Sequence, residues 1–283
     1  MRYGLNLLLW TDTLDEGILP VLEDIKRIGY DVVEVPIFEC DVAKYGRWGK
    51  RFDDAGLART GVTIRGVEDN PMSPEAAVRS KGIEANKAAV DCAAAAGCTA
   101  LVGPYHSALG YFSGAGPTAD EWRWAADSMR QVAEHADRAG VTLGLEYLNR
   151  FECYLLNTAA DGARFCRAVN HPRCQMMYDT FHSHIEEKNT PAAIRALKGM
   201  LAHVHISEND RSTPGQGNVR WAETFDTLKE IGYDNLMVVE AFGLALEKIV
   251  AATKIWRRMY QSEHQLASDA LRFMKEQVAQ RWK

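Results

Sequence analysis

Four short apolar segments of the chain each end in a residue of a type that commonly binds metal ions. These residues are Glu146, Asp179, His205 and Glu240, at the ends of segments 141–146, 174–179, 202–205 and 236–240. Three carboxylates and one imidazole, without a thiolate, favour a hard or borderline divalent ion over a structural zinc site. We expect Mn²⁺, with Mg²⁺ or Co²⁺ as alternatives. Two glutamates in such a set could also move protons at a substrate carbon, so Glu146 and Glu240 are the candidate acid and base.

Each of these residues also has a plainer interpretation. An acidic side chain at a strand end often caps a helix or forms an ion pair, and this applies to each of the three carboxylates taken alone. His203 and His205 share one face of their strand, so one of them could be a core histidine. His205 is the better ligand because it lies nearer the strand end. Glu34 and Glu68 also lie near expected strand ends. Either they have no role at the site, or they contact the ligands and support them.

The spacing of the four segments predicts the elements that position them. They follow one another at intervals of roughly thirty residues, the repeat of a (β/α)₈ barrel, whose active sites lie at the C-terminal ends of its strands. Short β-rich runs recur along the whole chain with helical patterns between them, as βαβ units require. We therefore predict an α/β fold, a single (β/α)₈ TIM barrel domain spanning 1–283. Its eight expected strands are Tyr3–Leu9, Asp31–Val35, Val62–Val67, Ala100–Val102, Val141–Glu146, Gln175–Asp179, Ala202–Ile206 and Leu236–Glu240.

The segments between the expected strands support this repeat. Ser80–Ala96 and Glu121–Ala139 have helical periodicity. Longer connections, 103–120 and 207–221, follow the fourth and seventh strands, where barrel enzymes carry substrate loops. The tail from about 244 to 283 is expected to be a helical extension that closes the barrel. Glycines that suit a left-handed residue at a helix end precede five strands, at Gly29, Gly61, Gly97, Gly140 and Gly232.

Composition limits the classes of partner. The 283 residues are 47% hydrophobic and 25% charged, with a net charge of −5, which argues against binding nucleic acid or an anionic membrane surface. The first apolar run reaches Asp12 too soon for a signal peptide or a membrane span. A small neutral molecule is the expected partner. Six cysteines without C-x-x-C spacing predict reduced, buried thiols and a cytoplasmic protein: Cys40, Cys92, Cys98, Cys153, Cys166 and Cys174.

The motifs around these ligands resemble the ketose 3-epimerases, which include the D-tagatose, D-allulose (D-psicose) and L-ribulose 3-epimerases. The resemblance covers most of the second half of the chain. It is carried by segments 145–152, 178–187, 205–211, 214–217, 228–234 and 240–242, together with Trp221. The first half is similar, more loosely, to the wider sugar isomerase and epimerase barrels through Trp10 and segments 29–34 and 103–112.

The resemblance implies roles for individual residues. Glu146, Asp179, His205 and Glu240 would bind the metal, and the two glutamates would be the acid and base. Glu152, His182 and Arg211 would hold the oxygens around C1 to C3 of a free ketose. The implied reaction removes the C3 proton with one glutamate, passes through a cis-enediolate, and returns a proton to the opposite face with the other. The resemblance implies a homodimer or homotetramer, and it implies no nucleotide cofactor.

The chain departs from the family pattern in its first half. Asn6 and Leu14 stand where some relatives have aromatic residues, and the loop 103–112 also differs. The distal part of the pocket is therefore expected to be particular to this chain, which leaves the preferred sugar open. The candidates for contacts there are Asn6, Trp10, Gly66 and His106.

Competing functions divide into two groups. Other reactions on the same scaffold are an aldose–ketose isomerase, a hydroxypyruvate-type isomerase and an inosose-type dehydratase, and only epimerisation needs Glu240 as a base opposite Glu146. More distant are a phosphodiesterase of the endonuclease IV type, which needs more ligands and a basic surface, and a sugar-binding protein without catalysis. We expect the epimerase.

Overall fold

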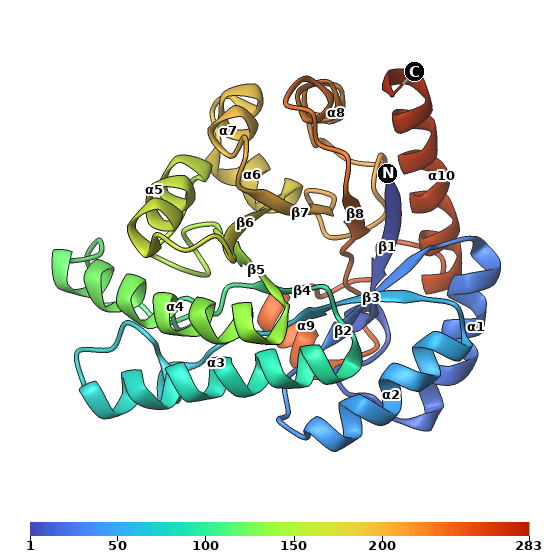
Figure 1. The fold of residues 1–283 in the computed structure, drawn as a ribbon. Coiled ribbons are helices and arrows are strands. Elements are labelled where there is room, and N and C mark those ends of the chain that lie inside the picture. The colour runs from blue at the N-terminus through green and yellow to red at the C-terminus, as the bar shows by residue number, and fades with distance from the viewer. Residues whose placement is uncertain (283) are drawn as a thin grey trace.

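Eight parallel strands close into a barrel in the computed structural model, which describes residues 1–282. Each strand pairs with the next along the chain, and β1 closes the ring against β8 through Gly4 opposite Val238. Figure 1 looks along the barrel and shows the helices on its outside. The strands are β1 (Arg2–Asn6), β2 (Val32–Pro36), β3 (Ala58–Val62), β4 (Ala100–Gly103), β5 (Thr142–Glu146), β6 (Cys174–Asp179), β7 (Leu201–Ile206) and β8 (Leu236–Val239).

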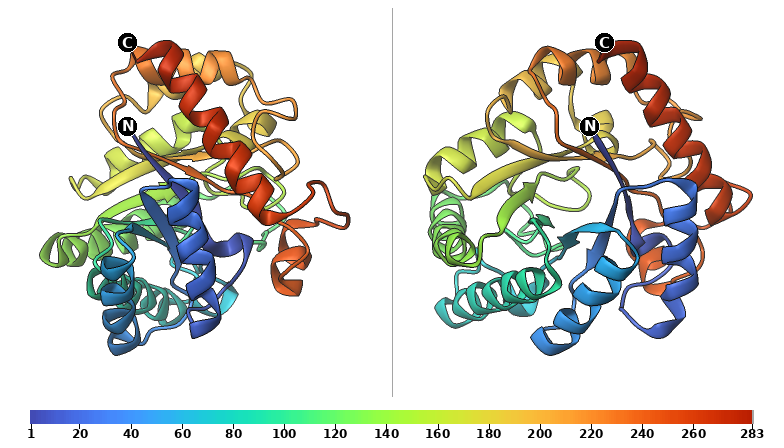
Figure 2. Two further views of the ribbon diagram at one scale, coloured as in Figure 1. Left: turned by 90° about the vertical axis from the view of Figure 1, so that its right-hand side faces the viewer. Right: turned by 45° about the vertical axis from the view of Figure 1, so that its right-hand side comes forward.

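The helices follow the strands in sequence, and the last one packs beside the first. They are α1 (Leu19–Ile28), α2 (Val42–Asp54), α3 (Ala76–Ala96), α4 (Ala119–Ala139), α5 (Ala159–Val169), α6 (Thr180–Glu186), α7 (Thr190–Ala196), α8 (Trp221–Glu230), α9 (Glu247–Thr253) and α10 (Glu263–Arg281). Helix α10 contacts α1 and β1 along the outside of the barrel, whereas the segment that carries α9 stands off one end of it (Figure 2). The expected barrel with a C-terminal helical extension is confirmed.

Local chemistry explains where several elements stop. Gly29, Gly97, Gly140 and Gly232 take the expected left-handed conformation, but Gly61 lies inside β3. Gly56, with φ +65°, turns the chain after α2 in its place. A side chain at Gly61 would collide with that of Ile37, so the absence of a Cβ serves packing there rather than a turn.

Two predicted strands were misplaced. The third was expected at Val62–Val67, but β3 runs over Ala58–Val62, where it pairs with Val32–Pro36 of β2. The guanidinium of Arg59 in this strand donates to the carbonyl oxygen of Ala96. The first strand was expected to continue to Leu9. It ends at Asn6, whose side chain accepts a hydrogen bond from the Leu8 amide and starts a 3₁₀ turn over Leu7–Leu9.

The remaining expectations concern cysteines and membranes. All six cysteines are free; five are buried as expected, and Cys40 is exposed. Within residues 1–282, no helix combines the length and the apolar character needed to cross a bilayer.

Candidate metal and substrate site

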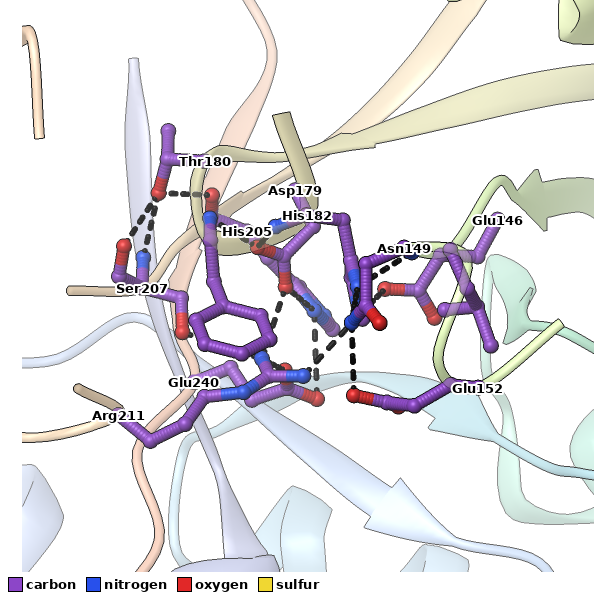
Figure 3. Close-up of polar contacts among 12 residues, drawn as sticks. Glu146, Asn149, Glu152, Asp179, Thr180, His182, His205, Ser207, Arg211 and Glu240 are labelled. Atoms are coloured by element: carbon purple, nitrogen blue, oxygen red, sulfur yellow. Dashed lines mark hydrogen bonds and ion pairs between the residues drawn. The ribbon is translucent and has the colours of Figure 1, made fainter. Parts of the chain in front are cut away.

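The four predicted ligands meet at one end of the barrel. Glu146 and Asp179 are the last residues of β5 and β6, His205 is the penultimate residue of β7, and Glu240 directly follows β8. The strand register places Asp179 opposite His205. One ligand atom from each of the four residues lies within 4.8 Å of all the others, and all four side chains are buried. Figure 3 shows Glu146 and Glu240 approaching from different sides.

The electrostatics of this group fit a divalent cation. Burial, together with repulsion from Glu240 and Asp179, raises the pKa of Glu146 well above its usual value. Burial also acts to raise the pKa of Glu240, but His205 and Arg211 lower it to about 2. Among residues 1–282, Glu146 Oε1 and His205 Nδ1 are buried without a hydrogen-bond partner. Three carboxylates and one free imidazole nitrogen are a donor set that suits Mn²⁺.

Arg211 inserts its guanidinium between the ligands. Its Nη1 contacts Glu240 Oε2 and lies 3.2 Å from Asp179 Oδ2, while its Nη2 lies 3.0 Å from His182 Nε2. The residue has φ +63°, which is uncommon for a side chain with a Cβ. Its amide donates to the Glu208 carbonyl, and its own carbonyl accepts from the Phe242 amide, so the backbone is held on both sides. These contacts fix the positively charged guanidinium of Arg211 at the floor of the site.

His182 lies between Arg211 and Glu146, with its Nε2 3.5 Å from Glu146 Oε1, and Asn149 links it to Glu152. The Asn149 amide donates to His182 Nδ1 at 3.0 Å, and Asn149 Nδ2 donates to Glu152 Oε1 at 2.8 Å. Burial, and secondarily Arg211, lower the pKa of His182 to about 3, so its ring is neutral at neutral pH. A neutral imidazole and a carboxylate linked through one asparagine present both donors and acceptors to a polar ligand.

A cavity of about 440 Å³ opens above these groups. Its polar floor consists of Glu146, Glu152, His182, Arg211 and Glu240. The wall above the floor is mainly apolar, and part of it comes from α9 through Ile249, Ala252 and Thr253. The other apolar side chains that line the cavity include Leu8, Phe38, Val62, Ile64, Leu109, Phe112 and Phe151.

Four residues assigned to the distal pocket do not line this cavity. His106 is buried, and its Nε2 lies 2.7 Å from the Glu146 carbonyl oxygen. Asn6 lies beneath the ligands, where it donates to Glu34 and Glu240. Trp10 ends the 3₁₀ turn after β1 and packs against the core, and Gly66 is an exposed residue that precedes the turn Val67–Asp69. Asn6 and His106 therefore contact the candidate ligands Glu240 and Glu146 instead of lining the cavity.

Several residues at the site had no assigned role. Phe181 and Phe242 flank the Arg211 guanidinium, with centroids 3.8 and 5.1 Å from its central carbon. Glu208 is buried and accepts hydrogen bonds from three backbone amides of the loop between β7 and α8 and from the indole of Trp221, the first residue of α8. These residues, like Asn149, stand within the segments that carry the family motifs. Their position within these motifs was the one signal in the sequence that they belong to the site. Residue type alone did not show whether they serve packing or function.

Comparison with known proteins identifies the class and then the family. The sequence profile described as xylose isomerase-like TIM barrel matches residues 22–277, so the chain belongs to that class of barrel proteins. Within it, the chain is 32% identical over 277 residues to an L-ribulose 3-epimerase of Mesorhizobium japonicum, covering 96% of this chain and 93% of the relative. It is 30% identical over 261 residues to a D-psicose 3-epimerase of Agrobacterium fabrum, covering 91% and 90%. The chain is a member of the ketose 3-epimerase family and hence an isomerase.

Solved structures of ketose 3-epimerases have the same fold as this chain. An L-ribulose 3-epimerase structure superposes with a TM-score of 0.93 at 32% identity, covering 99% of this chain and 95% of the other. A D-allulose 3-epimerase from Methylomonas sp., solved in complex with D-allulose, gives 0.92 at 27% identity, covering 98% and 97%.

Proposed function

We propose that this chain epimerises free ketoses at C3 with the help of a divalent ion, using Glu146 and Glu240 as two opposed bases. The observation that carries the proposal is the approach of these two carboxylates from β5 and β8, with ligand atoms within 4.8 Å of each other. Inversion at a carbon needs one group to remove a proton from one face and another to return a proton to the other face. Two glutamates on different sides of one small site meet that need.

The residues that would hold the ion are Glu146, Asp179, His205 and Glu240. A bound Mn²⁺, or Mg²⁺ or Co²⁺ in its place, would act as a Lewis acid that polarises the ketone and lowers the cost of negative charge next to it. No nucleotide cofactor is part of the proposal.

The side chains of the floor then have distinct tasks. One glutamate removes the C3 proton, and the other returns a proton from the opposite face of the planar cis-enediolate. Arg211 and His182 lie where they could donate hydrogen bonds to the sugar oxygens, and Glu152 could accept one from a hydroxyl. Glu146 and Glu240 are themselves buried, which limits the access of bulk water to the proton that they would transfer.

The substrate class follows from the relatives. Proteins similar to this chain are named for L-ribulose and D-psicose, and related structures were solved with D-allulose, D-tagatose and D-fructose. We propose a ketose of this group as the substrate. The apolar walls leave the floor as the main source of polar contacts, so recognition would depend mostly on C1 to C3 and less on the distal hydroxyls.

The test is incubation with D-tagatose, D-fructose and L-ribulose in D₂O with Mn²⁺, read by NMR. We expect deuterium at C3 together with the C3 epimer, and loss of both with EDTA. Deuterium only at C1 would replace the proposal with an aldose–ketose isomerase. Loss of a hydroxyl would indicate a dehydratase, and calorimetric binding without exchange would indicate a sugar-binding protein.

Three further expectations belong to this proposal. Residues 1–283 form one domain, which is supported by a barrel whose strands run from Arg2 to Val239. The enzyme acts in the cytoplasm, which is supported by six free cysteines, five of them buried. A homodimer or homotetramer stays a prediction from the family resemblance.

A further inference from the structure

Glu34 lies directly beneath the candidate metal ligands, with none of its side chain exposed. It projects from β2, and its carboxylate reaches across the barrel interior to β7, where Oε1 lies 2.6 Å from His205 Nε2. The other ring nitrogen of His205, Nδ1, is the one that faces Glu240 and Asp179, at 3.4 and 3.5 Å. The two nitrogens of one ring therefore face two different partners.

Polar groups from three other strands, β1, β3 and β7, surround the Glu34 carboxylate. Oε1 also accepts a hydrogen bond from Asn6 Nδ2 at 3.0 Å, and Oε2 accepts one from Thr60 Oγ1 at 2.9 Å. His203 Nε2 lies 3.0 Å from Oε2. Asn6, Glu34 and Thr60 are register neighbours on β1, β2 and β3, so the parallel pairing itself sets them at one level. Each carboxylate oxygen thus has two polar neighbours.

Asn6 extends this network to the second glutamate. Its Nδ2 also lies 3.4 Å from Glu240 Oε1, and its Oδ1 accepts from the Leu8 amide at 2.9 Å. One amide therefore contacts both Glu34 and Glu240 while its own rotation is fixed by the backbone. A ligand whose outer atoms are hydrogen-bonded in this way keeps its orientation when the site is filled.

We propose that Glu34 is a positioning residue for the metal site, an inference that rests on the metal dependence proposed above. By accepting from His205 Nε2–H, Glu34 fixes the tautomer in which Nδ1 has its lone pair free for the ion. Thr60 and Asn6 hold Glu34 in place through hydrogen bonds, His203 Nε2 lies 3.0 Å from Glu34 Oε2, and Asn6 couples Glu34 to Glu240. Neither Glu34 nor His203 touches the substrate or the ion.

The main alternative for the same residues is a second ion. Glu34, His203 and His205 also form a group whose ligand atoms lie within 4.8 Å of one another. The contacts argue against it, because both oxygens of Glu34 are already engaged by protein groups and His205 Nε2 sits at hydrogen-bond distance from Oε1. A single ion per chain is the expected stoichiometry.

The test measures metal binding without sugar. Mn²⁺ is titrated calorimetrically into EDTA-treated wild type and Glu34→Gln, which keeps the size of the side chain but removes its charge. We expect a roughly 10–100-fold weaker affinity, the usual effect of removing a partner of a ligating histidine. Glu68→Gln makes the same chemical change at an exposed residue outside the site and should leave the affinity unchanged. Wild-type affinity in Glu34→Gln would overturn the inference.

Two further measurements keep the inference testable if Glu34→Gln does not fold. Thr60→Val and His203→Gln each remove one polar neighbour of Glu34 Oε2, and both should weaken Mn²⁺ binding by a smaller factor; unchanged binding in both would overturn the inference. Co²⁺ loaded into wild type should bind one ion per chain, and two ions would assign Glu34 as a ligand instead. Because these assays contain no ketose, wild type that binds Mn²⁺ without C3 exchange would overturn the proposed reaction and leave this inference standing.

Discussion

The guanidinium of Arg211 lies over the ring of Phe181, with its central carbon 3.8 Å from the ring centroid. Phe242 lies on the guanidinium at 5.1 Å, so two aromatic rings flank a cation that also contacts Asp179 and Glu240. Aromatic faces attract cations, and the attraction is largest where water is excluded. The two rings therefore help to position the charged guanidinium of Arg211.

Replacement of Phe181 by leucine should weaken substrate binding more than folding. A desolvated cation–π contact is worth about 2 kcal/mol, so kcat/KM should fall by up to about 30-fold, mainly through KM. Steady-state kinetics with the best ketose would show this, and thermal unfolding should stay near that of wild type. A change in kcat alone would mean that the ring does not act through substrate contacts of Arg211.

Substitution of one base at a time should separate exchange from epimerisation. With Glu240→Gln, Glu146 can still remove the C3 proton that faces it, so one of the two epimers should exchange in D₂O without being converted. With Glu146→Gln, Glu240 can still remove the C3 proton of the other epimer, so that epimer should exchange without being converted. Conversion should drop by roughly 10²–10⁴-fold in both variants. If both variants still convert the sugar at the wild-type rate, two glutamates are not the bases.

A divalent ion should raise the unfolding temperature of the EDTA-treated protein. At a hundred times its Kd, an ion that binds only the folded state stabilises it by about 2.7 kcal/mol. Asp179→Asn is a selective probe, because Oδ1 caps α6 through the amides of Phe181 and His182 while Oδ2 faces the site. Asparagine keeps the capping oxygen and loses the ligand. Differential scanning fluorimetry should therefore show a Mn²⁺-dependent shift in wild type that shrinks in Asp179→Asn.

The sequence was most informative where function constrains residue types. The four ligands were predicted from their positions at strand ends, and the structure brings all four together. The prediction was less accurate for two other buried polar residues, Asn6 and His106, because residue type does not reveal whether a side chain faces the sugar or a ligand. Asn6 and His106 were expected against the sugar, but both contact the outer side of a ligand: Asn6 donates to Glu240, and His106 lies against the Glu146 carbonyl.

The displaced third strand has a related cause. Arg59 and Thr60 made the true strand look polar, yet each is satisfied inside the fold, Arg59 by the Ala96 carbonyl and Thr60 by Glu34. The Ala96 and Glu34 partners are 37 and 26 residues away in sequence, so no local pattern predicts these two hydrogen bonds.

Acid should destabilise the metal-free protein partly through His106. Burial lowers the pKa of this ring to about 4, only partly offset by its contact with the Glu146 carbonyl. Between pH 6.5 and 4 the unfolded chain therefore binds a proton that the folded chain does not, and stability falls as pH falls. The loss through this window is about 3 kcal/mol. Urea unfolding with EDTA at several pH values would measure it, and His106→Gln should reduce the slope.

Glu208 should control the loop that carries Arg211. Its two carboxylate oxygens accept from the amides of Asn209, Gly215 and Val219 and from the indole of Trp221. Glu208→Gln turns an amide donor toward two of these donors, which should cost about 1–3 kcal/mol of stability and raise KM. Glu223→Gln, at an exposed position on α8, is the matched control. Equal unfolding midpoints for the two variants would show that the loop does not depend on Glu208.

The contacts of Arg211 with Asp179 and Glu240 also bear on how the protein is assembled in a cell. Arg211 and His205 each lie within ion-pair distance of two of the buried carboxylates, Asp179 and Glu240. The barrel therefore does not need a metal ion to relieve their mutual repulsion while it forms. We expect newly made chains to fold first and to be loaded afterwards, so that the metal supply met by the mature protein, rather than conditions during synthesis, selects the ion it carries.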